Sequence, residues 1–426
     1  YKSDDFQPLI YRTKNWGQSW TKITNGIPIN HFTRAVRADR DRKGLLYAGT
    51  EYGVYFSIND GLTWQPLQLN LPIVPITDLA VKDTDLIAAT QGRGYWILDD
   101  LNVLQQFQEN QSEELVFYEP GPVYRLVAGS RSTDEPISAG TNPYDGVVFY
   151  YELPNELPDD VNLELSVFDS DGDSEEPIWS WSRKPADDSE DEEADPTGAP
   201  DTRVLPAKVG LNRHVWDLKY PAMERFDGII LWRDFDYGPT AKPGDYRARL
   251  TLGAESQDVS FKVLQDPRSN ASGADLQAQF NFVIESRDLL TRAHQEIRSI
   301  RKLREQTSAV KNRIESKGGN EDLVSAIEEL NGKLDEIEQA LYQTKSESEQ
   351  DPLNFPIRLN NKLSDLMGIT SVGDAAPTAQ AIQVKEEVSA AIVAELDALE
   401  TIWREDVPAI NRRFEAAGIS VIETER

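Results

Sequence analysis

One eight-residue pattern occurs twice near the start of the chain, and it constrains the fold more than any other feature. Residues 13–20 (TKNWGQSW) and 57–64 (SINDGLTW) share the pattern Ser/Thr-x-Asn-x-Gly-x-Ser/Thr-Trp at a spacing of 44 residues. The alignment continues into two further pairs of segments: 27–29 with 71–73, and 33–39 (TRAVRAD) with 77–83 (TDLAVKD). This part of the chain therefore contains two copies of one unit.

The repeated unit is short and rich in β-forming residues. LYAGT at 46–50 has a near copy, LIAAT, at 86–90, at a spacing of 40 residues. A period of about 40–45 residues built from short β-rich runs is typical of β-propeller blades. We therefore assign 1–101 to the final blades of a propeller and expect two four-stranded antiparallel units. Two blades cannot close a ring, because each blade needs a neighbour on both faces. Either more blades precede them in the native protein, or this part packs differently.

The residues of the pattern suit a tight structural turn. An Asn side chain can cap its own turn and tolerates left-handed backbone, and Gly takes a positive φ without steric cost. We expect Trp20 and Trp64 to pack in equivalent buried positions between blades. A direct part in ligand binding is the alternative. The residues to which we assign the structural role are Asn15, Gly17, Trp20, Asn59, Gly61 and Trp64.

These octets resemble the Asp-box of the BNR-repeat propellers, which include bacterial sialidases, xyloglucanase-like glycosidases and the sortilin ectodomain. The usual box is Ser-x-Asp-x-Gly-x-Thr-Trp, and Asn15 and Asn59 stand where that family prefers Asp. Segments 44–57 (GLLYAGTEYGVYFS) and 90–101 (TQGRGYWILDDL) resemble the end of the propeller in large bacterial proteins named BNR-repeat glycosyl hydrolases or sortilin-like proteins. The resemblance implies structural boxes at the blade peripheries and a secreted or periplasmic location.

Strand signals recur after a less regular stretch. Residues 102–145 lack a clear period, and we interpret them as a connector on a surface. Short strand-like runs at this density favour an immunoglobulin-like β-sandwich over 146–266. The runs are 147–153, 161–168, 177–183, 212–220, 245–252 and 258–264. Residues 210–220 and 242–250 also resemble Ig-like modules appended to bacterial secreted enzymes and to flagellar hook-cap proteins, which space or dock other domains.

Two acidic segments lie within the expected sandwich. Residues 169–176 (DSDGDSEE) are similar to a calcium loop, but Gly172 falls at its fourth position rather than its sixth, and strands rather than helices flank it. We interpret this segment as a hairpin turn, with a weak calcium site as the alternative. The insertion near 185–200 contains seven acidic residues between Asp187 and Asp195. Like-charge blocks are usually solvated, so we expect a mobile insertion, with partner binding as the alternative.

The hydrophobic period changes to that of an α-helix in 267–426. The expected helices cover 283–300, 323–341, about 355–367, and a stretch from about Pro377 to a stop or kink at Pro408. A tight Gly-Gly-Asn link at 318–320 makes the first two antiparallel. We expect a three- or four-helix bundle within one chain, with association between chains as the alternative. The residues expected to face one another are Leu290, Ile297, Leu330, Leu334 and Ile337, with Trp403 closing the bundle.

The sequence contains no complete catalytic or metal-binding motif. The absence of cysteine excludes disulfides, thiolate metal sites and cysteine nucleophiles. The three histidines, which lack zinc-site spacing, are His31, His214 and His294. A glycoside hydrolase needs two carboxylates about 5–10 Å apart, and no motif fixes a pair among Asp39, Glu51, Asp78, Asp99 and Asp100. A group of arginines is expected on a solvated strand edge: Arg34, Arg37, Arg40 and Arg42. We therefore assign no catalytic residue, no metal and no cofactor.

The net charge of −29 is carried by residues after 101, because 1–101 contains equal numbers of acidic and basic residues. This argues against general nucleic-acid binding, which needs basic patches, and favours a saline habitat or a solubilising surface.

No apolar run approaches the ~18 residues of a spanning helix, so we expect no membrane insertion. Because the first residue is Tyr1 rather than Met, we expect a piece or processed form of a longer chain.

Two classes of function remain. The first is a non-catalytic binding or structural C-terminal region of a secreted propeller protein that recognises a saccharide or peptide. Its partners would then include upstream blades of the same parent protein. The second is an accessory part of an active glycoside hydrolase whose catalytic carboxylates lie in the missing blades.

Overall fold

The computed structural model describes residues 4–108, 114–126, 140, 142–170, 176–183, 204–233, 235, 237–316 and 319–422. The chain forms two compact units that interleave in sequence. The first unit comprises Tyr1–Val123, Ser130–Asp217 and Asp245–Lys262, and the second comprises Tyr124–Gly129, Leu218–Gly244 and Val263–Arg426. Each unit is described by itself.

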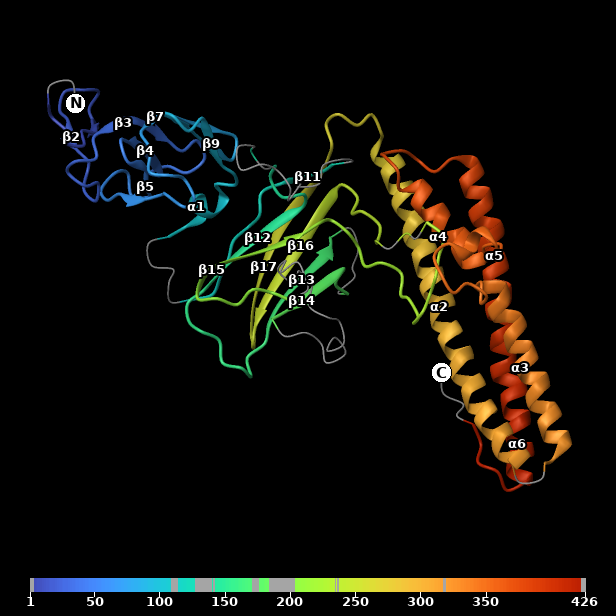
Figure 1. Ribbon diagram of the computed structural model, residues 1–426. Coiled ribbons are helices and arrows are strands. Elements are labelled where there is room, and N and C mark those ends of the chain that lie inside the picture. The colour runs from blue at the N-terminus through green and yellow to red at the C-terminus, as the bar shows by residue number, and fades with distance from the viewer. Residues whose placement is uncertain are drawn as a thin grey trace. The chain divides into compact units, whose positions relative to one another are not determined.

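Three antiparallel sheets follow one another at the start of the first unit (Figure 1). Their strands are β1 (Tyr11–Arg12), β2 (Thr21–Lys22), β3 (Thr33–Ala38), β4 (Leu46–Thr50), β5 (Gly53–Ser57), β6 (Gln65–Pro66), β7 (Ile76–Lys82), β8 (Asp85–Thr90) and β9 (Tyr95–Leu98). The sheets have the orders β1-β2, β3-β4-β5-β6 and β7-β8-β9. We call them the first, middle and last sheets. A short helix, α1 (Asn102–Gln106), follows the last sheet.

The expectation of two four-stranded units is therefore wrong, because within residues 4–108 the sheets have two, four and three strands. The octets explain the difference. Each octet forms the turn between the third and fourth strands of a unit, so the first octet belongs to a sheet of which the described residues supply two strands. After β9 the chain continues into α1 without a third octet, and the last sheet has no fourth strand from this segment.

Apolar layers join these three sheets. One buried cluster contains Tyr47 and Phe56 from the middle sheet together with Leu79 and Leu86 from the last sheet. The opposite face of the middle sheet packs on residues that flank the first sheet. That second cluster comprises Ile10, Ile23, Ile27, Ala48, Tyr55 and Trp64. The middle sheet is thus covered on both faces.

The remaining described strands form two further sheets, in the orders β10-β12-β15 and β11-β17-β16-β13-β14. The strands are β10 (Val116–Phe117), β11 (Val123–Arg125), β12 (Val147–Leu153), β13 (Leu163–Asp169), β14 (Trp179–Ser182), β15 (Gly210–Trp216), β16 (Gly244–Leu252) and β17 (Glu255–Gln265). All six expected runs form strands. Alternate side chains of β12 are buried, as a half-covered strand requires.

Residues 102–145, which we interpreted as a surface connector, supply β10 and β11 to these sheets. The side chains of Leu115, Phe117 and Tyr118 are buried. The Phe117 ring packs 6.0 Å from that of Phe149. The period of this stretch is hard to detect because each strand contains three residues or fewer.

The second unit is mainly helical. Its elements are α2 (Gly273–Ser316), α3 (Glu321–Leu341), the 3-10 turn η3 (Asp351–Leu353), α4 (Leu359–Thr370), α5 (Ala379–Thr401), the π-helical turn η4 (Ile402–Asp406) and α6 (Val407–Ala416). The five residues expected to face one another all lie in its single buried cluster, with Trp403 packed against it. Packing within one chain therefore accounts for both apolar seams.

Local sequence explains some of the helix ends. Asn320 caps α3 by accepting a hydrogen bond from the Leu323 amide, as expected. The third helix begins at Leu359 rather than near Phe355. Pro408 lies in the first turn of α6, directly after the π-helical turn that interrupts the α-helical pattern after Thr401. The interruption falls just before the proline, which lacks the N–H that a regular α-helix needs at this position.

A segment from the middle of the sequence completes the helical core. We had placed 218–244 within the sandwich, but this segment clusters with the helices. The side chains of Met223, Phe226, Leu231 and Phe235 lie in the helical core cluster.

Candidate functional site

The first octet forms a closed hydrogen-bonded turn. The Asn15 Oδ1 accepts from the Ser19 amide at 2.9 Å, and its Nδ2 donates to the Ser19 Oγ at 2.9 Å. The Thr13 Oγ1 accepts from the Gly17 amide at 2.8 Å. Gly17 has φ 90°, the left-handed region that favours glycine.

The second octet repeats these bonds. The Asn59 Oδ1 accepts from the Thr63 amide at 2.9 Å, and its Nδ2 donates to the Thr63 Oγ1 at 2.7 Å. The Ser57 Oγ accepts from the Gly61 amide at 2.9 Å, and Gly61 has φ 82°. The Asn amide donates to the hydroxyl, so the turn closes without the carboxylate of the usual box. In both octets these side chains stabilise the turn.

The tryptophans of the two octets differ, so the expectation of equivalent buried positions is wrong. Trp64 is 3% exposed, and Trp20 is 59% exposed. Tyr11 and Tyr55 occupy equivalent places in β1 and β5 and differ in the same way, at 51% and 7% exposed. The reason is packing: the first sheet and its flanking residues cover this face of the middle sheet, whereas the same face of the first sheet is open.

The hydrogen-bond register aligns the last sheet with the middle sheet. The equivalent pairs are Tyr47–Phe56 with Ile87–Ile97, and Gly49–Val54 with Ala89–Tyr95. Both sheets also have an irregularity at the same place, between Thr33 and Ala35 in β3 and between Ile76 and Asp78 in β7. The last sheet therefore repeats the first three strands of the middle sheet.

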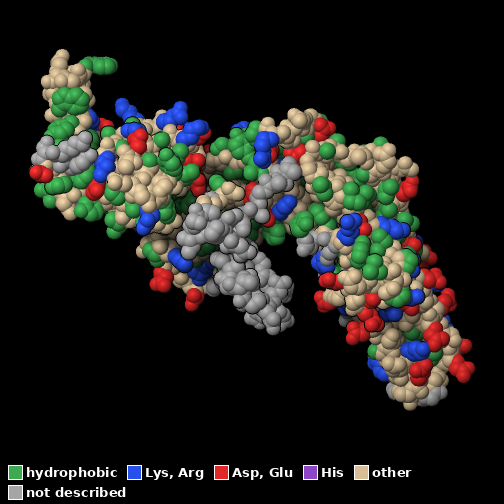
Figure 2. All heavy atoms as spheres, turned by 45° about the horizontal axis from the view of Figure 1, so that its top comes forward, with side chains coloured by type: hydrophobic (Ala, Val, Ile, Leu, Met, Phe, Trp, Pro, Cys, Tyr) green, Lys and Arg blue, Asp and Glu red, His purple; other side chains and the backbone are tan. Residues whose placement is uncertain are grey.

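The last sheet has an open apolar face. Tyr95 and Ile97 are 80% and 57% exposed. Their equivalents Val54 and Phe56 are 3% and 9% exposed, because the last sheet covers them. Figure 2 shows hydrophobic side chains at the surface of this part of the chain, among Lys and Arg side chains. Tyr95 and Ile97 belong to no motif of their own, and only an extension of the repeat through 95–98 would have indicated them from the sequence.

A groove separates β9 from the segment after β6. It is a shallow hollow with about 50 Å³ of space for water, and its lining is mainly apolar. The lining comprises Val54, Leu67, Gln68, Leu69, Asn70, Leu71, Leu86, Ala88, Trp96, Ile97 and Leu98. The open faces and this groove together form the candidate site, and its chemistry is that of apolar and β-strand contact.

The candidate catalytic carboxylates have structural partners. Asp39 accepts hydrogen bonds from the Arg42 amide at 2.8 Å and from the Tyr47 hydroxyl at 2.9 Å. Burial, together with this carboxylate, raises the pKa of Tyr47. Glu51 and Asp78 form ion pairs with two of the expected arginines, Arg34 and Arg37 respectively. Asp100 accepts from the Asn102 amide, and burial raises its pKa.

The three histidines have different surroundings. His31 bonds to the Tyr55 hydroxyl at 2.9 Å, and burial lowers its pKa. His214 on β15 is buried beside Trp181, and burial lowers its pKa to about 4. His294 is buried in the helical unit, where its Nδ1 bonds to the Glu224 carbonyl at 2.7 Å.

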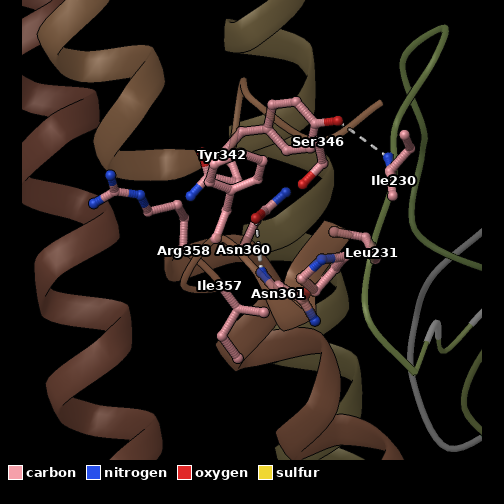
Figure 3. A pocket seen from close by; sticks show the side chains of 11 residues that line it. Ile230, Leu231, Tyr342, Ser346, Ile357, Arg358, Asn360 and Asn361 are labelled. Carbon is pink, nitrogen blue, oxygen red and sulfur yellow. Dashed lines mark hydrogen bonds between the residues drawn. The ribbon is translucent and has the colours of Figure 1, made fainter. Parts of the chain in front are cut away.

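A crevice in the helical unit shows how the segment 218–244 is held (Figure 3). The Tyr342 hydroxyl accepts from the Ile230 amide at 3.1 Å. The Asn361 amide pairs with both the N–H and the carbonyl of Trp232, at 2.7 and 2.9 Å. Arg358 points away from Ile230 (Figure 3). We assign this crevice a structural role, since its polar groups bind the chain's own backbone.

Neither a metal-binding cluster nor a membrane-spanning helix is found among the described residues. In that part of the chain, no group of three or more His, Asp or Glu side chains could hold a metal ion. None of the helices described there combines the length and the apolar character needed to cross a membrane. The centre of the calcium-like loop, 171–175, and the acidic run from Asp187 to Asp195 lie outside the described residues.

The chain was compared with known proteins in three ways. No protein-family model matches it, and a search of the curated proteins finds no match. Among solved structures, the crystal structure of an ancestral GH74 enzyme matches 21% of this chain and 11% of that chain, at 24% identity and a TM-score of 0.19. The match covers a small part of both chains, and the site is therefore defined by this chain's own geometry.

Proposed function

We propose that the chain is a non-catalytic binding and structural region of a secreted Asp-box propeller protein, in which 1–101 are blades that stack on further blades. The observation that supports this most is the equivalence between open and covered faces. Tyr95 and Ile97 repeat residues that a following sheet covers, and Tyr11 and Trp20 repeat residues that a preceding sheet covers. A unit of a stacked repeat needs such neighbours.

The energy available at these faces is substantial. Burying a large apolar side chain contributes roughly 1.5–3 kcal/mol, and each open face presents at least two. The sheets at either end therefore gain stability when another sheet of the repeat covers them. A saccharide or peptide ligand is proposed for the assembled protein.

Self-association tests the stacking. The open face of the last sheet and that of the first sheet repeat surfaces that contact each other within the chain. We therefore expect head-to-tail association at high concentration, measured by analytical ultracentrifugation. Tyr95→Lys should weaken it, whereas Leu62→Lys, at a residue 61% exposed in the second octet, should not. A strictly monomeric chain at all concentrations would count against stacking.

Glycosidase activity distinguishes this proposal from the alternative, in which the chain is an accessory part of a glycoside hydrolase. The partners of Asp39, Glu51 and Asp78 support structural roles for these carboxylates. We expect no turnover of aryl glycosides by the purified chain. Turnover that is abolished by a single Asp or Glu substitution within 1–101 would favour the alternative, and a glycan and peptide array would identify a ligand.

A further inference from the structure

The last sheet lacks the strand that completes its neighbour. In the middle sheet, β6 pairs antiparallel with β5, and the Leu67 amide donates to the Val54 carbonyl at 2.8 Å. In the first sheet, β2 pairs with β1 in the same register. In the described part of the chain, β9 has β8 as its one neighbouring strand, and it ends its sheet. An edge strand presents backbone groups that can pair with another strand.

The strand β6 is anchored by Trp64, which lies directly before it. The Trp64 indole Nε1 donates to the Ile23 carbonyl at 2.8 Å, and its backbone amide donates to the Asn25 carbonyl at 2.8 Å. The ring lies in the cluster that contains Ile23, Ile27 and Tyr55. The loop after β2 thus forms the pocket that holds the tryptophan of the next unit.

The groove beside β9 corresponds to this tryptophan pocket in the next unit of the repeat. Leu67 and Leu71 follow Ile23 and Ile27 by 44 residues. Both leucines line the groove. On its other side, Ala88 and Trp96 hold the places that Ala48 and Tyr55 hold in the middle sheet.

The tryptophan that would fill this pocket is absent from the next unit of the repeat. By the 41-residue spacing that relates β5 to β9, the place of Trp64 falls on Gln105 in α1, which does not line the groove. The lining, the register and the missing strand therefore all indicate the same occupant.

We propose that β9 and this groove bind an extended peptide segment that contains Ser/Thr-Trp, of the kind found at Ser19–Trp20 and Thr63–Trp64. The segment adds antiparallel to β9 as a fourth strand, and its indole enters the groove against Leu67 and Leu71. Backbone pairing provides affinity, and the aromatic pocket provides specificity, as in other strand-addition sites. The inference rests on the proposed function for the equivalence of the sheets, and it names the peptide class that this site takes.

Peptide binding to the full chain tests the proposal. The probe is a dye-labelled peptide with the sequence of 59–70 (NDGLTWQPLQLN), followed by fluorescence anisotropy. We expect saturable binding that weakens by about tenfold or more when the peptide Trp is replaced by Ala, since the indole is the largest buried group. Equal binding of the two peptides, or no binding at millimolar concentration, would overturn the proposal.

Chain variants locate the binding. Leu69→Lys changes a groove residue that is 71% exposed, so the fold should tolerate it, and it should weaken peptide binding. Leu62→Lys lies outside the groove and should leave binding unchanged. Hydrogen exchange at Tyr95–Leu98 should slow when the peptide is bound. Unchanged exchange there, or equal effects of the two variants, would contradict strand addition.

The peptide-binding test can fail independently of the self-association test of the proposed function. Tyr95 is on the open face but does not line the groove, so Tyr95→Lys tests stacking and Leu69→Lys tests strand addition. Peptide binding without head-to-tail association supports the site and counts against the stacking. Association without peptide binding overturns the site alone.

Discussion

Gly17 and Gly61 have the same backbone conformation in different surroundings. Both have positive φ, where an L side chain costs about 1–2 kcal/mol. A Cβ at Gly61 would also lie 2.5 Å from the Ile23 Cδ1, whereas at Gly17 its nearest neighbour would be 3.9 Å away. We predict that Gly61→Val lowers the free energy of unfolding by more than ~1 kcal/mol, and by more than Gly17→Val does. Urea denaturation of both variants measures this, and equal losses would contradict it.

His214 should make the stability of the β-sheets around it pH-dependent. Burial lowers its pKa from 6.5 to about 4, so between these values the unfolded state binds more protons than the folded state. Stability therefore rises with pH over this window, by up to about 3 kcal/mol, and is lost as the pH falls towards 4.

The His214→Phe variant isolates this contribution, because the His214 Nε2 has no hydrogen-bond partner to lose among the described residues. Its free energy of unfolding should depend less on pH than that of the original chain between pH 4 and 6.5. The same slope in both proteins would show that His214 does not titrate as stated.

At the scale of the element, identical turns contribute unequally to stability. Trp64 is buried and Trp20 is mostly exposed. We predict that Trp64→Ala costs about 3–5 kcal/mol, whereas Trp20→Ala changes stability by no more than about 0.5 kcal/mol. Thermal and urea unfolding of the two variants compares them directly. A similar cost for both would mean that Trp20 is covered in solution.

The segment 218–244 should behave as part of the helical unit. Phe226 is 3% exposed and packs edge-on against the rings of His294 and Tyr342. We predict that Phe226→Ala destabilises the helices by about 3–5 kcal/mol, seen as a lower melting temperature by circular dichroism at 222 nm. Glu329→Ala, on an exposed position of α3, is the control and should stay within about 0.5 kcal/mol. An unchanged helical transition in Phe226→Ala would contradict this packing.

The elements also show what the sequence could and could not predict. The octet turns and the helical seams were predictable because their determinants are local: spacing, caps and glycine positions. The docking of 218–244 was not, since it depends on single side chains such as Phe226 and on bonds from Asn361 to Trp232, far away in sequence. The groove could not be predicted from local sequence for a related reason. The repeat leads one to expect a fourth strand and a tryptophan after β9. The chain does not supply them there, and the groove lies at the place they would occupy.

At the scale of the whole molecule, charge and apolar surface are unevenly distributed. The net charge of −29 lies in residues after 101, and Figure 2 shows acidic side chains gathered over the helical unit. The β-sheet repeat has balanced charge and open apolar faces instead. This contrast suits a repeat that binds other sheets and a helical unit that remains solvated.

The central claim is that the three sheets of 1–101 form a stack that is covered in the middle and open at both ends. Native-state hydrogen exchange of the full chain tests it most directly, through β4 and β8, which each pair with a strand on both sides. In a stacked repeat, a sheet with one covered face opens more easily than a sheet with two. We predict that the amides of β8 exchange faster than those of β4, and that the difference shrinks on self-association. Equal protection of β4 and β8 in the dilute chain would contradict the account.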